Sequence, residues 1–141
     1  MISKSLTDTQ KMAKDFLQNL SPSSTQATIV ELIGDLGSGK TTFTKAFASE
    51  LGVVETVISP TFVIQKRYDI PNHPQFKTLI HIDAYRLENP SEILKLNWQQ
   101  DLENPKNVIL VEWSGNIQEH IPQSTQIHFA FVDEATREII W

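Results

Sequence analysis

Cysteine is absent from the 141-residue sequence, which excludes disulfide bonds, thiolate nucleophiles and cysteine-based zinc sites. Long apolar runs are missing too. No stretch is long enough to cross a bilayer, and residues 1–5 lack the apolar core of a signal peptide. We therefore expect a cytoplasmic protein with no membrane attachment.

Basic residues are in deficit, with 12 Lys and Arg against 17 Asp and Glu and a formal net charge of −5. Binding to nucleic-acid phosphates requires a local excess of Lys and Arg. We therefore expect no autonomous nucleic-acid binding, and we expect any link to RNA to run through a protein partner.

Glycine is scarce as well, but three of the five glycines fall within one short stretch. Gly34, Gly37 and Gly39 lie in segment 33–42, directly after the apolar run 28–32. The segment matches the pattern G-x-x-x-x-G-K-[S/T] between a predicted strand and a predicted helix, as a phosphate-binding loop requires. Its amides can turn inward around a phosphate at the positive end of the helix. The alternative is an ordinary glycine-rich turn.

Three polar residues in or after this loop are candidates for chemistry. Lys40 supplies a mobile positive charge for the outer phosphates, and the Thr41 hydroxyl is placed to ligate Mg²⁺. Thr61 follows Pro60 in a segment that could order around the γ-phosphate of a bound triphosphate. For Thr61 the alternative is a simple turn threonine.

Two acidic residues, Asp83 and Glu112, each follow an apolar run typical of a strand. The carboxyl ends of parallel strands meet at one edge of a sheet, so either acid could serve Mg²⁺ beside Thr41. The residues alone leave open which acid contacts the metal. His81, Asp83 and Tyr85 alternate, so an extended chain would place them on one face, with His81 supporting the geometry of Asp83.

Three helices are predicted from their boundary residues. Thr7 and Gln10 have the spacing of a capping box, which predicts a first helix with Thr7 as its N-cap. The helix that follows the phosphate loop should end at Gly52. Asn89, followed by Pro90, indicates the start of a short helix.

The strand pattern predicts an α/β fold in one domain, residues 1–141. The run 108–111 is typical of a central parallel strand. The runs 62–68 and 77–84 predict a hairpin, and the alternating segment 127–141 predicts a second hairpin at the sheet edge. The expected architecture is a P-loop NTPase-like sheet, with a mostly parallel core and antiparallel hairpins, flanked by helices.

Four ordered motifs resemble those of the TsaE (YjeE) family: residues 34–42, 59–62, 81–87 and 111–113. The family are small bacterial ATPases that act with the TsaB and TsaD proteins. Together they install threonylcarbamoyl on the adenosine beside the anticodon of tRNAs that read codons starting with A. The resemblance implies ATP and Mg²⁺ as ligands, a TsaB–TsaD complex as partner, tRNA contacted only indirectly, and slow hydrolysis that resets the complex.

The resemblance also implies roles for individual residues. Asp83 would aid hydrolysis together with Lys40 and with Thr61 in a nucleotide-sensing loop. Thr41 and Glu112 would serve Mg²⁺. The residues expected to hold the phosphates are Gly37, Ser38, Gly39, Lys40, Thr41 and Thr42.

Other function classes remain open at this point. A small-molecule P-loop kinase would need an Arg-rich lid, whereas Arg67, Arg86 and Arg137 are widely separated. A GTP switch would need an Asn-Lys-x-Asp segment, which the sequence lacks. A further alternative is a docking protein gated by nucleotide, for which hydrolysis is not essential.

Overall fold

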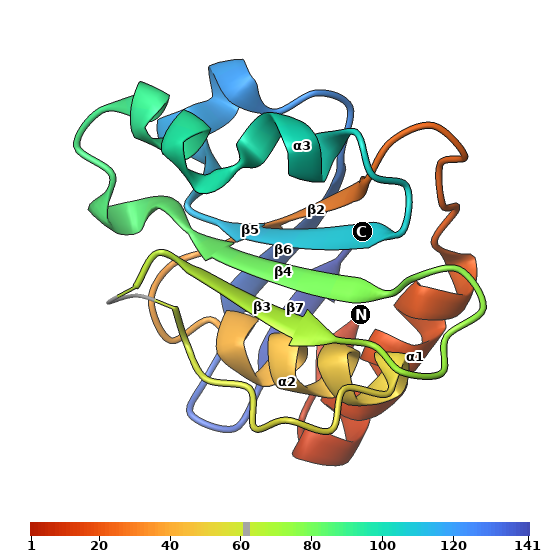
Figure 1. Cartoon of the computed structure of the whole chain (residues 1–141). Coiled ribbons are helices and arrows are strands. Elements are labelled where there is room, and N and C mark those ends of the chain that lie inside the picture. The colour runs from red at the N-terminus through yellow and green to blue at the C-terminus, as the bar shows by residue number, and fades with distance from the viewer. Residues whose placement is uncertain (61–62) are drawn as a thin grey trace.

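Four neighbouring strands at the centre of the sheet run parallel to one another, in the order β6-β2-β5-β4. The computed structural model describes residues 1–60 and 63–141, and within them seven strands form one sheet, in the order β1-β7-β6-β2-β5-β4-β3 (Figure 1). The strands are β1 (Ile2–Ser3), β2 (Thr28–Ile33), β3 (Gln65–Asp69), β4 (Thr78–Asp83), β5 (Asn107–Glu112), β6 (Thr125–Phe131) and β7 (Arg137–Ile140). The outer pairs β3–β4, β6–β7 and β1–β7 are antiparallel, which confirms the predicted mixed architecture.

Helices cover both faces of the sheet, as Figure 1 shows. On one face lie α1 (Leu6–Asn19) and α2 (Lys40–Leu51), which pack against each other and form an apolar core with Val30 and Leu32 of β2. On the other face, α3 (Trp98–Leu102) and short 3₁₀ segments enclose a second core. These segments are Ala84–Arg86, Pro90–Leu96 and Ser114–His120.

The central strand β5 is buried along its whole length, as the predicted apolar run requires. Its alternate residues serve different cores: Val108 and Leu110 face α1 and α2, whereas Ile109 and Val111 face the α3 side. A strand buried on both faces is held in place along its whole length. The backbone position of the residue at its carboxyl end, Glu112, is therefore fixed.

The predicted N-cap of the first helix was wrong. Ser5 is the N-cap of α1: its hydroxyl accepts a hydrogen bond from the Asp8 amide at 3.1 Å, and Asp8 in return accepts from the Lys4 amide at 2.9 Å. A reciprocal box two residues upstream therefore takes precedence, and Thr7 lies in the first helical turn. The predicted caps at Gly52 and Asn89 are confirmed.

The C-terminal hairpin, β6–β7, is confirmed, but its predicted place at the sheet edge was wrong. The short strand β1 pairs with β7 and forms that edge, while β6 lies parallel to β2. The hairpin is thus carried into the sheet beside the strand that leads into the phosphate loop.

The predicted first hairpin is also confirmed as β3–β4, with β3 starting at Gln65. No helix in the described ranges has the length and apolar character needed to span a bilayer.

Candidate functional site

The glycine-rich stretch forms a tight loop between β2 and α2, as predicted. Gly34 lies against β6, where an added Cβ would be 2.5 Å from the Phe129 carbonyl oxygen, so no larger residue fits. Gly39 precedes α2 with a left-handed backbone, φ 105°, and makes no side-chain cap. The first amides of α2 therefore face the site without a side chain competing for them.

Lys40 folds back into the loop. Its ammonium group donates hydrogen bonds to the carbonyl oxygens of Gly34 and Asp35, the latter at 2.9 Å, and lies 5.1 Å from the centre of the Trp113 ring. Burial lowers the pKa of Lys40, and the neighbouring carboxylates Glu112, Asp35 and Asp83 oppose this shift. The cation is therefore fixed between the loop and the acidic strand ends.

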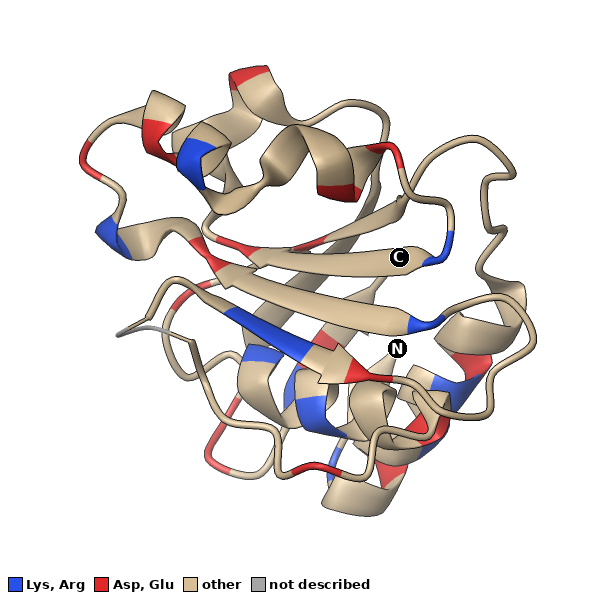
Figure 2. Cartoon of the chain, viewed as in Figure 1, with Lys and Arg blue, Asp and Glu red and all other residues tan. Residues whose placement is uncertain are grey.

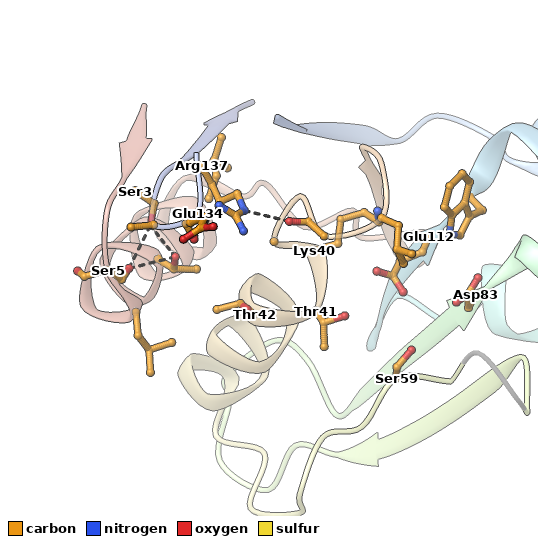
Figure 3. A pocket seen from close by; sticks show the side chains of 18 of the residues that line it. Ser3, Ser5, Lys40, Thr41, Thr42, Ser59, Asp83, Glu112, Glu134 and Arg137 are labelled. Atoms are coloured by element: carbon orange, nitrogen blue, oxygen red, sulfur yellow. Dashed lines mark hydrogen bonds between the residues drawn. The ribbon is translucent and has the colours of Figure 1, made fainter. Parts of the chain in front are cut away.

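Asp83 and Glu112 meet at the carboxyl ends of β4 and β5, as the sequence predicted. They are directly opposed in the parallel ladder, and both are nearly fully buried. Both line one cavity together with Lys40 and Thr41 (Figure 3). The site thus combines a cation, a hydroxyl and two carboxylates from three different elements.

His81 contacts Glu112, whereas the sequence predicted that it would support Asp83. Its Nε2 lies 3.3 Å from Glu112 Oε2, an ion-pair distance without the alignment of a hydrogen bond, and the ring is 1% exposed. The prediction that Tyr85 continues the same strand face was also wrong. Asp83 accepts a hydrogen bond from the Tyr85 amide at 3.0 Å, which caps a 3₁₀ turn and ends the strand.

Thr61, a predicted catalytic residue, lies outside the described residues. The described chain resumes at Val63, and the next residue, Ile64, has a left-handed backbone, φ 66°. The Ile64 carbonyl accepts a hydrogen bond from the Asp83 amide at 2.8 Å, so the segment leading into β3 is attached to the end of β4. A β-branched residue in this conformation is unusual and strained, and nothing in the sequence signalled it.

The cavity has a volume of about 740 Å³, the size of a small-molecule site. Its phosphate-loop end is lined by Gly37, Gly39, Lys40, Thr41 and Thr42. Its far end lies between the start of α1 and the β6–β7 hairpin, lined by Ser3, Ser5, Leu6, Thr9, Glu134, Ala135 and Ile139, while Arg137 lines the cavity against the phosphate loop. Ser38 is buried in the loop and does not line the cavity.

The residues present suit Mg²⁺ bound together with a phosphate ligand. In the described part of the chain, no three His, Asp or Glu side chains form a self-sufficient metal cluster. Mg²⁺ is usually held by one or two carboxylates, waters and the phosphates of a substrate. The Thr41 hydroxyl with Glu112 and Asp83 at one end of the cavity meets that requirement.

These features define a phosphate-loop nucleotide-binding fold of the α/β class. A family profile described as "Threonylcarbamoyl adenosine biosynthesis protein TsaE" matches residues 3–139. The chain therefore belongs to the TsaE family, as its motifs predicted.

Individual relatives agree with this assignment. The chain is 51% identical over 69 residues to the tRNA threonylcarbamoyladenosine biosynthesis protein TsaE of Bacillus subtilis, an alignment that covers 49% of this chain and 41% of the relative. It is 38% identical over 96 residues to the protein of the same name from Rickettsia typhi, covering 67% and 61%. These alignments thus span about half the length of the curated relatives. The crystal structure of B. subtilis YdiB superimposes with a TM-score of 0.71 at 32% identity, covering 99% of this chain and 80% of that one.

Proposed function

We propose that this chain is a Mg²⁺-dependent ATPase that acts with TsaB and TsaD in the threonylcarbamoyl modification of tRNA. The modified base would be the adenosine beside the anticodon in tRNAs that read A-starting codons. Membership of the TsaE family supports the pathway. The observation that carries the activity is the convergence of Lys40, Thr41, Asp83 and Glu112 on one cavity.

Each residue has a separate task in this proposal. The loop amides and Lys40 hold the outer phosphates of ATP, and Thr41 with Glu112 holds Mg²⁺, which when bound neutralises phosphate charge. Asp83 orients the attacking water or the metal and can accept the proton released. The far end of the cavity, between α1 and the β6–β7 hairpin, is left for the nucleoside.

The arginines support slow hydrolysis and disfavour a kinase. Arg67 forms an ion pair with Asp101 of α3, Nη1 to Oδ2, at 2.9 Å. Arg137 donates to main-chain carbonyl groups. Both side chains are thus engaged in the fold, whereas rapid phosphoryl transfer needs cations around the transferring group. We therefore expect the TsaB–TsaD partner to stimulate turnover.

Contact with tRNA is assigned to the partner proteins. Within the described ranges, Lys and Arg positions are scattered among Asp and Glu over α1, α2, β3 and the loops (Figure 2). With a net charge of −5, this surface offers little attraction to a polyanion.

The test combines two readouts on the purified chain, with and without TsaB–TsaD. Phosphate release from ATP should be feeble alone and rise with the partners, and threonylcarbamoyl-modified tRNA should appear only with all components and ATP. Lys40→Ala should weaken ATP binding and abolish both readouts. A complete reaction mixture that yields no ATP-dependent gain in modified tRNA would contradict the proposal. Unchanged tRNA modification by an Asp83→Ala variant that no longer hydrolyses ATP would favour a nucleotide-gated docking role.

A further inference from the structure

Arg137 connects the β6–β7 hairpin to the phosphate loop, from 100 positions further along the chain. Its Nε donates a hydrogen bond to the Gly37 carbonyl at 3.0 Å. Its Cγ lies 3.4 Å from the position that a Cβ on Gly39 would occupy, so the stem of the arginine packs against the loop. Figure 3 shows the guanidinium group beside the loop, at the wall of the cavity that Glu134 shares.

The other side of the guanidinium group is fixed by the hairpin. Nη1 donates to the carbonyl oxygens of Asp133 at 2.5 Å and Thr136 at 2.9 Å, with a longer contact to Glu134 at 3.5 Å. The Cζ atom lies 4.6 Å from the centre of the Phe131 ring. These groups hold the guanidinium in one orientation. The Nε group that donates to Gly37 is therefore fixed relative to the sheet.

This contact determines the plane of one peptide group in the loop. A planar peptide directs its carbonyl and the following amide in opposite directions. The Gly37 carbonyl is held by Arg137, and the amide of Ser38 donates to the Asp35 carbonyl at 3.1 Å. Glycines on either side of Ser38 leave this part of the loop free to rotate unless such bonds restrain it.

We propose that Arg137 is a positioning residue that holds the phosphate loop in its binding conformation, so that recognition of a diphosphate depends on it. The inference rests on the proposed nucleotide-binding function. Without the arginine, the loop would have to become ordered when ligand binds, and this entropic cost would weaken binding. The affinity should fall for ligands whose phosphates the loop amides surround, and it should not change for a nucleoside without phosphate.

The experiment separates these ligand classes. ADP, inorganic pyrophosphate and adenosine are titrated by calorimetry into the wild-type chain, Arg137→Met and Arg137→Lys, with Arg67→Met as a control that removes an arginine paired on the α3 side. We expect Arg137→Met to raise the Kd for ADP and pyrophosphate about tenfold, the size of one lost hydrogen bond to a charged group. The Kd for adenosine should stay within about twofold of the wild type, as should every Kd of Arg67→Met.

Arg137→Lys keeps the stem and charge but has no planar fork to join Gly37 with the hairpin carbonyls. It should weaken ADP binding about threefold, and it serves as the test should Arg137→Met fail to fold in a thermal melt. An equal loss for adenosine and ADP would overturn the inference, because Arg137 would then contact the nucleoside itself. Unchanged ADP binding in the variants would also overturn it. Wild-type ADP binding reports separately on the proposed function, whose failure would remove the basis of this inference.

Discussion

The two faces of the central strands β4 and β5 differ in the residues that they carry at the carboxyl end of the strands. On the face toward α1 and α2, β4 and β5 begin with the apolar residues Leu79 and Val108 and end with Asp83 and Glu112. On the opposite face the same strands begin with the polar residues Thr78 and Asn107 and are apolar from there to their carboxyl ends, with side chains such as Ile109 that are fully buried. One face therefore carries the two acids of the candidate site at its carboxyl end, and the other supplies the packing that keeps the strands in place.

The largest effect should come from the apolar face. Ile109→Ala removes a fully buried side chain next to Val111 and should lower the free energy of unfolding by about 2–5 kcal/mol. Urea denaturation measures this change. Val54→Ala, which truncates an exposed β-branched residue, is the control and should change the free energy of unfolding by less than about 0.5 kcal/mol. If Ile109→Ala left stability intact while abolishing ADP binding, the division between the two faces would be broken.

A change at the polar end should affect turnover and leave the fold intact. Asp83→Asn keeps the shape of the side chain but cannot take up a proton, so we expect the rate of ATP hydrolysis to fall about hundredfold or more. The Kd for ADP should stay within about threefold, because Lys40 and the loop amides are unchanged. Phosphate release and calorimetric titration give the two values. If the hydrolysis rate and the affinity for ADP fell by the same factor, Asp83 would be assigned to nucleotide binding.

Substitution of His81 tests whether a buried residue further down β4 also contributes to the candidate site. His81→Leu removes the contact to Glu112 and should raise about tenfold the Mg²⁺ concentration needed for tight ADP binding, because nothing would then orient the carboxylate proposed to hold the metal. His81→Gln, whose amide nitrogen can replace Nε2, should recover most of this loss. ADP titrations over a range of Mg²⁺ concentrations provide the measurement. Identical Mg²⁺ dependence in wild type and His81→Leu would show that Glu112 needs no support.

The smallest effect concerns Lys40 and pH. Burial lowers the pKa of Lys40 below its usual value of 10.5, so in the window between the lowered pKa and 10.5 the unfolded chain binds more protons than the folded one. Stability should therefore gain from this group as pH rises through that window. Lys40→Met should lack this contribution. Urea midpoints of both proteins at several alkaline pH values provide the comparison, and parallel pH profiles would contradict the shift.

The sequence could predict the parts of the site that are local. The phosphate loop is contiguous, and Asp83 and Glu112 each follow a recognisable strand, so their convergence required only that the strands be parallel neighbours. The left-handed cap at Gly52 is equally local.

Other features depend on strand order, which residue patterns do not specify. The pairing of β6 with β2 placed the hairpin beside the loop strand and brought Arg137 to the loop, while β1 took the edge position beyond β7. The contact between His81 and Glu112 is diagonal, between neighbouring strands, so alternation along β4 alone pointed to Asp83. Tyr85 was misplaced because the Asp83 side chain caps a turn and stops the strand.

The ladder between β4 and β5 has one further consequence. Asp83 and Glu112 are paired residues on adjacent strands, so their main chains are separated by the interstrand spacing of about 4.8 Å. The pairing therefore fixes where the two side chains begin, whereas their rotamers set the distance between the two carboxyl groups. Because both acids start from neighbouring positions at one end of the sheet, a single cation such as Lys40 can interact with both at once.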